Sequence, residues 1–437
     1  MSIAKKKARR MIHLGRIAEE LQKCARCGEC RSVCPVFDEL GWEKYAARGK
    51  VALTHAVIRG ELGLTESYGE VINNCLLCLA CVENCGSGVR LDRIIIAARN
   101  EMTQEKGLPF VKRMAHRLLS SGRELIDYFA MGGSVAQYLL FKRLPGSSGL
   151  KRRFPLPMVE KDRYIPSLVL RPFRSRMPEI NSAQGARRRV LFFTGCLVNF
   201  VYPNIGESVV QVLHRFDTDV IIPRAQHCCG APAEVGGDLG TARALARKNL
   251  DALLADPHDI VTACASGGYM LKKVYPDLFD RRDPYFRKAL SVAGRTYDIS
   301  EYLVKKIGMQ TIQRNLKSNS LKTVTYHDPC HLVRGQGIAD EPRQLLRAAF
   351  GERFVELKEA DRCCGSGGTY GLTHRNTSLR ILQRKTEHIL STGAEIVATG
   401  CPGCMLQLKD GLYRHGSDKR VYHVIELFNR RFSNQDG

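Results

Sequence analysis

Apolar and polar residues alternate with a helical period in the first third of the chain. In residues 9–21 (RRMIHLGRIAEEL), apolar side chains at positions 11, 12, 14, 17 and 21 predict one stripe of an amphipathic helix. Three further segments, 50–62, 91–102 and 110–130, predict helices by the same pattern. Residues 143–161 (RLPGSSGLKRRFPLPMVEK) and 170–180 (LRPFRSRMPEI) are instead rich in Pro, Gly and Arg, and predict a linker.

From residue 188 onward the pattern changes to short β-branched and aromatic runs, each followed by cysteine and then by a helical stretch. VLFF, IVTA, VTYH and IVAT begin at residues 190, 260, 324 and 396 and predict strands. Repeated strand, loop and helix indicate an α/β fold with a mainly parallel sheet. The cysteines are then expected at the carboxyl ends of the strands, where such sheets place their functional sites.

This last part of the chain is an internal duplication. Equivalent cysteines of the two halves are separated by 134, 135 and 137 residues, and each half closes with an amphipathic helix, at 297–307 and 422–432. We therefore expect a multidomain chain: a helical domain at 1–105, a helical and then basic Pro/Gly-rich linker at 106–187, and two α/β domains at 188–318 and 319–437.

Composition limits the compartment and the partners. The 437 residues include 17 cysteines, and the N-terminus has no apolar core or cleavage site of a secretory signal. No run of eighteen apolar residues predicts a membrane span. We therefore expect a cytoplasmic protein, where clustered cysteines indicate metal or redox chemistry.

The net charge of +23 is concentrated in places, since residues 142–189 hold 13 Lys and Arg against three acids. Nucleic acid is disfavoured as a partner, because aromatic residues are few and no nucleic-acid motif accompanies the charge. The expected alternatives are an acidic partner subunit, the anionic inner face of the cytoplasmic membrane, which the basic linker would contact peripherally, and a solvated linker.

The first eight cysteines form two copies of C-x2-C-x2-C-x3-C. Three thiolates at this spacing fit three corners of a cubane, and the fourth cysteine reaches the other cluster. The spacing thus predicts two [4Fe–4S] clusters with crossed ligation rather than two structural zinc sites, which usually pair C-x2-C with a distant pair. One departure is Gly86, which follows the second copy where Pro35 follows the first. The predicted ligands are Cys24, Cys27, Cys30 and Cys85 for cluster one, and Cys75, Cys78, Cys81 and Cys34 for cluster two.

The nine remaining cysteines resemble the cysteine-rich CCG domain, through Cys330, Cys363-Cys364-Gly365 and Cys401-Pro402-Gly403-Cys404. A helical two-cluster ferredoxin module followed by tandem CCG domains resembles the iron–sulfur subunits of glycolate and D-lactate oxidases. ARGKV at 47–51, TGC at 194–196 and CCGSGGTYGLTH at 363–374 carry the likeness to that branch. The corresponding subunits of anaerobic glycerol-3-phosphate dehydrogenase and of heterodisulfide reductase are related families.

This resemblance implies an electron-transfer subunit, with no residue of its own acting as acid or base on the substrate. Electrons would come from a partner subunit that holds FAD and oxidises glycolate or D-lactate, with no flavin on this chain, and would go to quinone or another carrier. It also implies a third, non-cubane [4Fe–4S] cluster held by five cysteines of the second CCG domain. The first CCG domain has glycine at the fifth position, Gly267, so its cluster is in question. The implied ligands are Cys330, Cys363, Cys364, Cys401 and Cys404 in the second domain, and Cys196, Cys228, Cys229 and Cys264 in the first.

Alternatives remain open for the function and for two histidines. A heterodisulfide-reductase-like subunit with a catalytic cluster and a glycerol-3-phosphate dehydrogenase subunit are the competing functions. His227 and His331 adjoin motif cysteines, and either tune a cluster by hydrogen bonding or satisfy local backbone. Trp42 is expected to pack in the core of the ferredoxin module.

Overall fold

The computed structural model describes residues 17–121, 131–137, 140–143, 149–152, 164–316 and 322–432. They form two compact units. The first combines residues 1–117, 230–242 and 362–384, and the second combines 118–229, 243–361 and 385–437. The helix expected at 9–21 is described from residue 17, and the part of the 110–130 helix beyond residue 121 lies outside the described residues, as do 144–148 and 153–163 of the linker.

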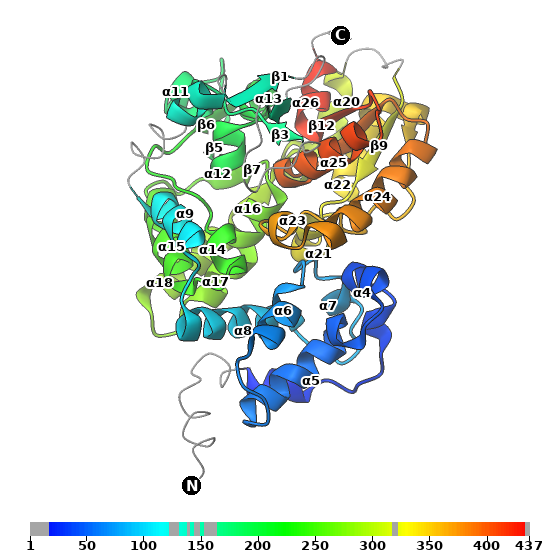
Figure 1. Ribbon diagram of the computed structural model, residues 1–437. Helices are drawn as coiled ribbons and strands as arrows, with labels where there is room; N and C mark the ends of the chain where they lie inside the picture. Colours follow the sequence, from blue (N-terminus) through cyan, green and yellow to red (C-terminus); the bar gives the residue numbers. More distant parts are fainter. Residues whose placement is uncertain are drawn as a thin grey trace. The chain divides into compact units, whose positions relative to one another are not determined.

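The first unit is helical, and most of it is drawn in blue in Figure 1. Its core includes Val57, Ile72, Ile94 and Ala98, all fully buried, from three helices. Besides the start of α15 and α24, its elements are α3 (Ala18–Gln22), η1 (Glu29–Arg31), α4 (Pro35–Leu40), η2 (Glu43–Tyr45), α5 (Ala47–Ile58), α6 (Glu66–Asn73), α7 (Ala80–Glu83), α8 (Leu91–Lys106), α9 (Phe110–Ser120), α14 (Ala231–Val235) and α23 (Tyr370–Thr373).

Helix α4 shows how local chemistry sets an element beside the cysteines. Pro35 occupies its first turn, where a missing N–H costs nothing, and the Cys34 thiol accepts the Phe37 N–H. Gly41, with φ of 71°, ends the helix. The next residue, Trp42, is 68% exposed, so the expectation that it packs in the core was wrong. The left-handed turn at Gly41 leaves the indole on the surface.

The second unit contains two parallel sheets of equivalent strand order. The first is β4-β6-β5-β7-β8 and the second β10-β9-β11-β12. The duplicated sequence thus folds twice into the same α/β arrangement, as expected, and β4 adds an antiparallel edge before residue 188. The strands are β4 (Ile180–Asn181), β5 (Arg188–Phe193), β6 (Thr218–Ile221), β7 (Asp259–Thr262), β8 (Thr296–Asp298), β9 (Val324–His327), β10 (Phe354–Val355), β11 (Ile396–Thr399) and β12 (Arg420–His423).

Helices cover these sheets, and three short strands from the predicted linker pair with one another (Figure 1). Helix α13 of the first half packs on α26 of the second, where the Asn429 amide donates to Gln211 Oε1 at 2.6 Å. The remaining elements are β1 (Phe141–Arg143), β2 (Gly149–Arg152), β3 (Ile165–Pro166), α11 (Phe173–Arg176), α12 (Gly195–Phe200), α13 (Pro203–Arg215), α15 (Leu239–Leu254), α16 (Ala265–Tyr269), η3 (Met270–Val274), α17 (Tyr275–Leu278), α18 (Pro284–Gly294), α19 (Ile299–Tyr302), η4 (Leu303–Gly308), α20 (Met309–Asn315), α21 (Cys330–Gln336), α22 (Asp340–Phe350), η5 (Gly351–Arg353), α24 (Arg375–Ser391), α25 (Pro402–Arg414) and α26 (Val424–Arg430).

Within the described ranges, each helix is too short or too polar to cross a lipid bilayer.

Candidate iron–sulfur sites

The two C-x2-C-x2-C loops have the same unusual backbone. Arg26 and Gly28 have φ of 59° and 94° in the first loop, and Leu77 and Leu79 have φ of 53° and 65° at the equivalent positions of the second. For residues other than glycine, this left-handed conformation costs about 1–2 kcal/mol each. Such strain persists where the surroundings require one loop shape. In the first loop Cys27 is exposed, whereas Cys78 at the equivalent position of the second loop is buried.

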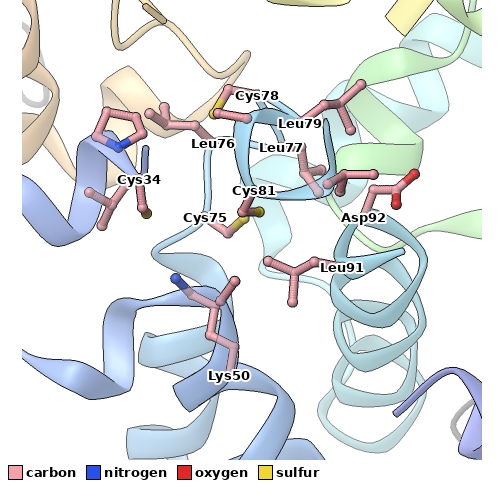
Figure 2. A pocket seen from close by; sticks show the side chains of 15 residues that line it. Cys34, Lys50, Cys75, Leu76, Leu77, Cys78, Leu79, Cys81, Leu91 and Asp92 are labelled. Atoms are coloured by element: carbon pink, nitrogen blue, oxygen red, sulfur yellow. The ribbon is translucent and has the colours of Figure 1, made fainter. Parts of the chain in front are cut away.

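Four thiols line a single cavity in the first unit, namely those of Cys34, Cys75, Cys78 and Cys81 (Figure 2). They are the set that the spacing assigns to cluster two. Burial raises the pKa of the Cys81 thiol well above its usual value, and Cys75, Cys78 and Cys34 raise it further. A bound iron cluster would reverse this effect, because its cations favour the thiolate form. The donor set, four soft sulfur ligands in an otherwise largely apolar cavity, therefore fits an iron–sulfur cluster.

Two of the cysteines assigned to cluster one lie close enough to affect each other. Burial raises the pKa of Cys30, and neighbouring Cys24 and Cys34 raise it further, against an opposing contribution from Arg48. Asn84, which precedes Cys85, donates its side-chain amide to Glu29 O at 3.1 Å, next to Cys30. This hydrogen bond ties the end of the second motif to the loop of the first, as crossed ligation requires.

Two buried cations flank the cluster-two cysteines. Lys50 of α5 is 1% exposed and lines the same cavity, and Figure 2 shows its amino group directed toward the cysteines. Arg99 of α8 donates to the carbonyl oxygen of Cys75 at 2.7 Å, and to those of Ile72, Asn73 and Val235 at 3.2, 3.1 and 2.9 Å. Burial lowers the pKa of Arg99 from its usual range, and the nearby Cys75 opposes that change. The helical pattern of the sequence did not single out Lys50 or Arg99, because each occupies an ordinary polar position in a predicted helix.

The loop that carries Cys363 and Cys364 belongs to the first unit. The Tyr370 hydroxyl donates to Asn74 Oδ1 at 2.8 Å, and a Cβ added at Gly367 would lie 2.7 Å from Leu76 Cδ2. Asn74 and Leu76 stand on either side of Cys75. This part of the second CCG motif is therefore in contact with the loop of the second ferredoxin motif.

The glycine of the CCG sequence has the same conformation in both halves. Gly230 and Gly365 have φ of 87° and 85°, values that side chains rarely adopt. A Cβ at Gly365 would also lie 2.7 Å from the Ser378 carbonyl oxygen. The glycine is therefore required by backbone geometry.

The other three cysteines of the second motif, Cys330, Cys401 and Cys404, belong to the second unit. Cys330 and Cys401 sit at or just before the starts of α21 and α25, after the carboxyl ends of β9 and β11. His327, the last residue of β9, has a ring nitrogen within 4.8 Å of Cys404 Sγ. Sequence analysis did not select His327, although a histidine that ends an apolar strand three residues before a motif cysteine is a visible signal.

In the first CCG motif, the four cysteines have different hydrogen-bond partners. A hydrogen bond with Cys228 and burial raise the pKa of Cys196 well above its usual value. Cys264 instead faces the other half: its hydrogen bond with Cys401 raises its own pKa, and the same bond lowers the pKa of Cys401 well below the usual value. The Ser266 hydroxyl also lies 3.9 Å from Cys401 Sγ. The two halves thus meet through sulfur atoms at their strand ends.

The two histidines that adjoin motif cysteines, His227 and His331, make local contacts. His227 Nδ1 lies 2.7 Å from the carbonyl oxygen of Ala225, and burial lowers its pKa. His331 Nδ1 lies 3.2 Å from Ser266 Oγ, and its ring stacks on Tyr269 with centroids 4.7 Å apart.

Comparison with known proteins matches both cysteine-rich regions of the chain to family models. Residues 20–89 match a model described as a 4Fe-4S dicluster domain, and residues 190–272 and 324–409 each match a cysteine-rich CCG domain. The chain is 32% identical over 241 residues to lactate utilization protein A of Oceanobacillus iheyensis, covering 55% of this chain and 96% of that protein. It is 36% identical over 252 residues to a fumarate reductase (CoM/CoB) subunit of Methanothermobacter marburgensis, covering 57% and 48%.

A relative covering nearly the whole chain decides the family. The probable glycolate oxidase iron-sulfur subunit of Bacillus subtilis is 30% identical over 418 residues, which cover 93% of each chain. The chain belongs to the family of glycolate oxidase iron–sulfur subunits.

Proposed function

We propose that this chain is the electron-transfer subunit of a flavin-dependent 2-hydroxyacid dehydrogenase complex. Electrons from an FAD-containing partner subunit would pass through the two ferredoxin-type sites to the second CCG motif, and from there to quinone or another carrier. The iron–sulfur clusters, when bound, supply one-electron chemistry. The residues of this chain hold them, separate them from water and set their potentials.

The packing of the Cys363–Cys364 loop against the cluster-two loop carries this proposal. Electron transfer through protein weakens steeply with distance and with gaps in packing. Here the two loops are in direct contact, through the hydrogen bond between Tyr370 and Asn74 at 2.8 Å and the close approach of Gly367 to Leu76. This contact favours the second CCG motif as the site that accepts electrons from cluster two.

The proposed ligands follow from spacing and family. Cluster one would take three cysteines of the first motif with Cys85, and cluster two those of the second with Cys34. The second CCG motif would hold a further, non-cubane cluster through Cys330, Cys363, Cys364, Cys401 and Cys404. The first motif lacks the fifth cysteine at Gly267, and we propose no five-cysteine cluster there.

Substrate and partners are proposed from the relatives and from charge. The names glycolate oxidase and lactate utilization support glycolate or D-lactate as the acid oxidised on the partner. The net charge of +23 supports an acidic partner surface and peripheral contact with an anionic membrane face.

The test is a reconstitution of the full chain with the FAD-containing subunit. Freeze-quench EPR after mixing with glycolate or D-lactate should show reduced clusters at the rate of flavin oxidation. Cys78→Ser should stop electron flow before the CCG motif, whereas Cys404→Ser should leave the ferredoxin signals reducible and abolish quinone reduction. Clusters that remain oxidised while the flavin is reduced would overturn the proposal.

A further inference from the structure

His327 is a buried imidazole at the carboxyl end of a central strand. It is the last residue of β9 and is fully buried. Neither ring nitrogen has a hydrogen-bond partner in the part of the chain that the structure describes. The adjacent carboxylate of Asp328 is engaged by Arg343, at 2.6 and 2.8 Å.

A buried imidazole without partners is unfavourable. A neutral ring carries one donor and one acceptor, and each of them destabilises the folded state when it is buried without a hydrogen-bond partner. One of its nitrogens lies within 4.8 Å of Cys404 Sγ, yet no hydrogen bond joins them. Metal–sulfur and metal–nitrogen bonds of about 2.3 and 2.0 Å at a tetrahedral angle place two ligands of one metal ion about 3.5 Å apart. The nitrogen and the sulfur lie within 4.8 Å of each other, so a small shift of either side chain brings them to that separation.

The duplicated half of the chain provides an internal comparison. Phe193 ends β5 as His327 ends β9, and Gly267 stands where the second half has Cys404. A Cβ at Gly267 would lie 3.8 Å from the Phe193 ring, so this pair of positions is also adjacent in the first half. The half that lacks the fifth cysteine therefore also lacks the histidine, and the Phe193 ring stands beside Gly267.

We propose that His327 is an iron ligand of the second CCG motif, binding through one imidazole nitrogen beside Cys404. This inference rests on the iron–sulfur site proposed for that motif, and adds a nitrogen to its all-sulfur donor set. A neutral imidazole adds a donor without adding negative charge, so the cluster keeps a higher reduction potential than one with a further thiolate at that position. The second motif would then accept electrons readily from cluster two.

The experiment uses the full chain, purified without oxygen, with natural or 15N-labelled histidine. Pulsed EPR of the third cluster should show a strong nitrogen coupling that changes with the isotope. His327→Phe copies the residue that the first half tolerates, and should remove the coupling and lower the iron content toward about eight per chain, the value for two cubanes. His327→Cys should retain iron, lose the coupling and shift the reduction equilibrium of that cluster at least about tenfold toward the oxidised form, about 59 mV. His331→Gln, at another histidine beside a motif cysteine, should retain both the iron and the coupling.

The outcomes separate this inference from the proposed function. A third cluster whose signal lacks histidine nitrogen, with iron content and potential unchanged in both His327 variants, overturns the ligand assignment alone. An iron content of about eight in the unaltered chain, insensitive to Cys404→Ser, overturns the CCG step of the proposed function and the ligand assignment together.

Discussion

Replacing Lys50 should lower the reduction potential of cluster two while leaving cluster one nearly unchanged. Lys50 is 1% exposed, lines the cavity of the cluster-two cysteines and donates to the carbonyl oxygen of Tyr45. The other charged residue of that cavity, Asp92, is already paired with Arg90 at 2.6 Å. The ammonium charge therefore acts on the cluster without a close neutralising carboxylate in the lining of the cavity. Reduction adds one negative charge, which this cation stabilises.

The size of the effect follows from Coulomb's law. For charges about 8 Å apart, roughly the span of such a cavity, an effective dielectric constant of about 20 gives about 2 kcal/mol. That energy is a change of about 30-fold in the reduction equilibrium, or about 90 mV for one electron. Arg48, beside cluster one, should matter far less, because its guanidinium is partly exposed and is paired with Glu43.

The assay is a redox titration followed by EPR, with Cys78→Ser identifying the cluster-two signal. Lys50→Met removes charge and donor, whereas Lys50→Gln keeps a donor for the Tyr45 carbonyl. Both should lower the potential by similar amounts, and Arg48→Gln is the matched control. A shift in Lys50→Met alone would assign the effect to the hydrogen bond, and unchanged potentials in both variants would refute the electrostatic reasoning.

Three further predictions concern the stability of the first unit, the iron content of the first CCG domain and the pH dependence of stability. Gly365→Ala should destabilise the first unit by about 2 kcal/mol or more in denaturant titrations, because alanine must adopt φ of 85° with its Cβ 2.7 Å from the Ser378 carbonyl. Gly368→Ala is the control: its φ is also positive, but its Cβ would meet open space, so it reports the cost of the backbone conformation without the contact. Gly267→Cys combined with Phe193→His should add iron to the first CCG domain, measured as iron and sulfide per chain, and unchanged iron would contradict it. Burial lowers the pKa of His374 to about 4, so its contribution to stability is present above the unfolded value of about 6.5 and is lost as pH falls toward 4. His374→Gln should remove about 1–2 kcal/mol of that acid-side loss, after allowance for solvent screening at this half-buried site, and an identical pH profile for the variant would contradict the assignment.

Local pattern predicted the elements well where one physical requirement dominated. The β-branched runs at 190, 260, 324 and 396 became β5, β7, β9 and β11, because a strand covered on both faces must be apolar throughout. The repeated cysteine offsets predicted two equivalent domains, and the strand orders agree. The prediction for Trp42 was wrong because hydrophobicity predicts burial only on average. The turn at Gly41 sets the direction of the indole, which is exposed.

The pattern of apolar and polar residues did not predict which segments distant in the sequence pack together. The loop 362–384 reads as part of the second α/β domain, yet it folds with the ferredoxin module, through the hydrogen bond between Tyr370 and Asn74. Lys50 reads as a polar position of a surface helix, although its ammonium group is buried beside thiols. In both cases, contacts between residues distant in the sequence decide the outcome, and periodicity carries no information on them.

The duplication also explains how the two halves came to differ chemically while their fold stayed the same. A strand order needs only apolar strands and the positive-φ glycine of each CCG loop, and both halves retain these. The first half keeps four of the motif cysteines and differs from the second at two adjacent positions. Phe193 and Gly267 stand there in place of His327 and Cys404, so two neighbouring donors are absent and an aromatic ring takes their place. The second half thus keeps the donors of the proposed ligand site, and the first half contacts it through the hydrogen bond between Cys264 and Cys401.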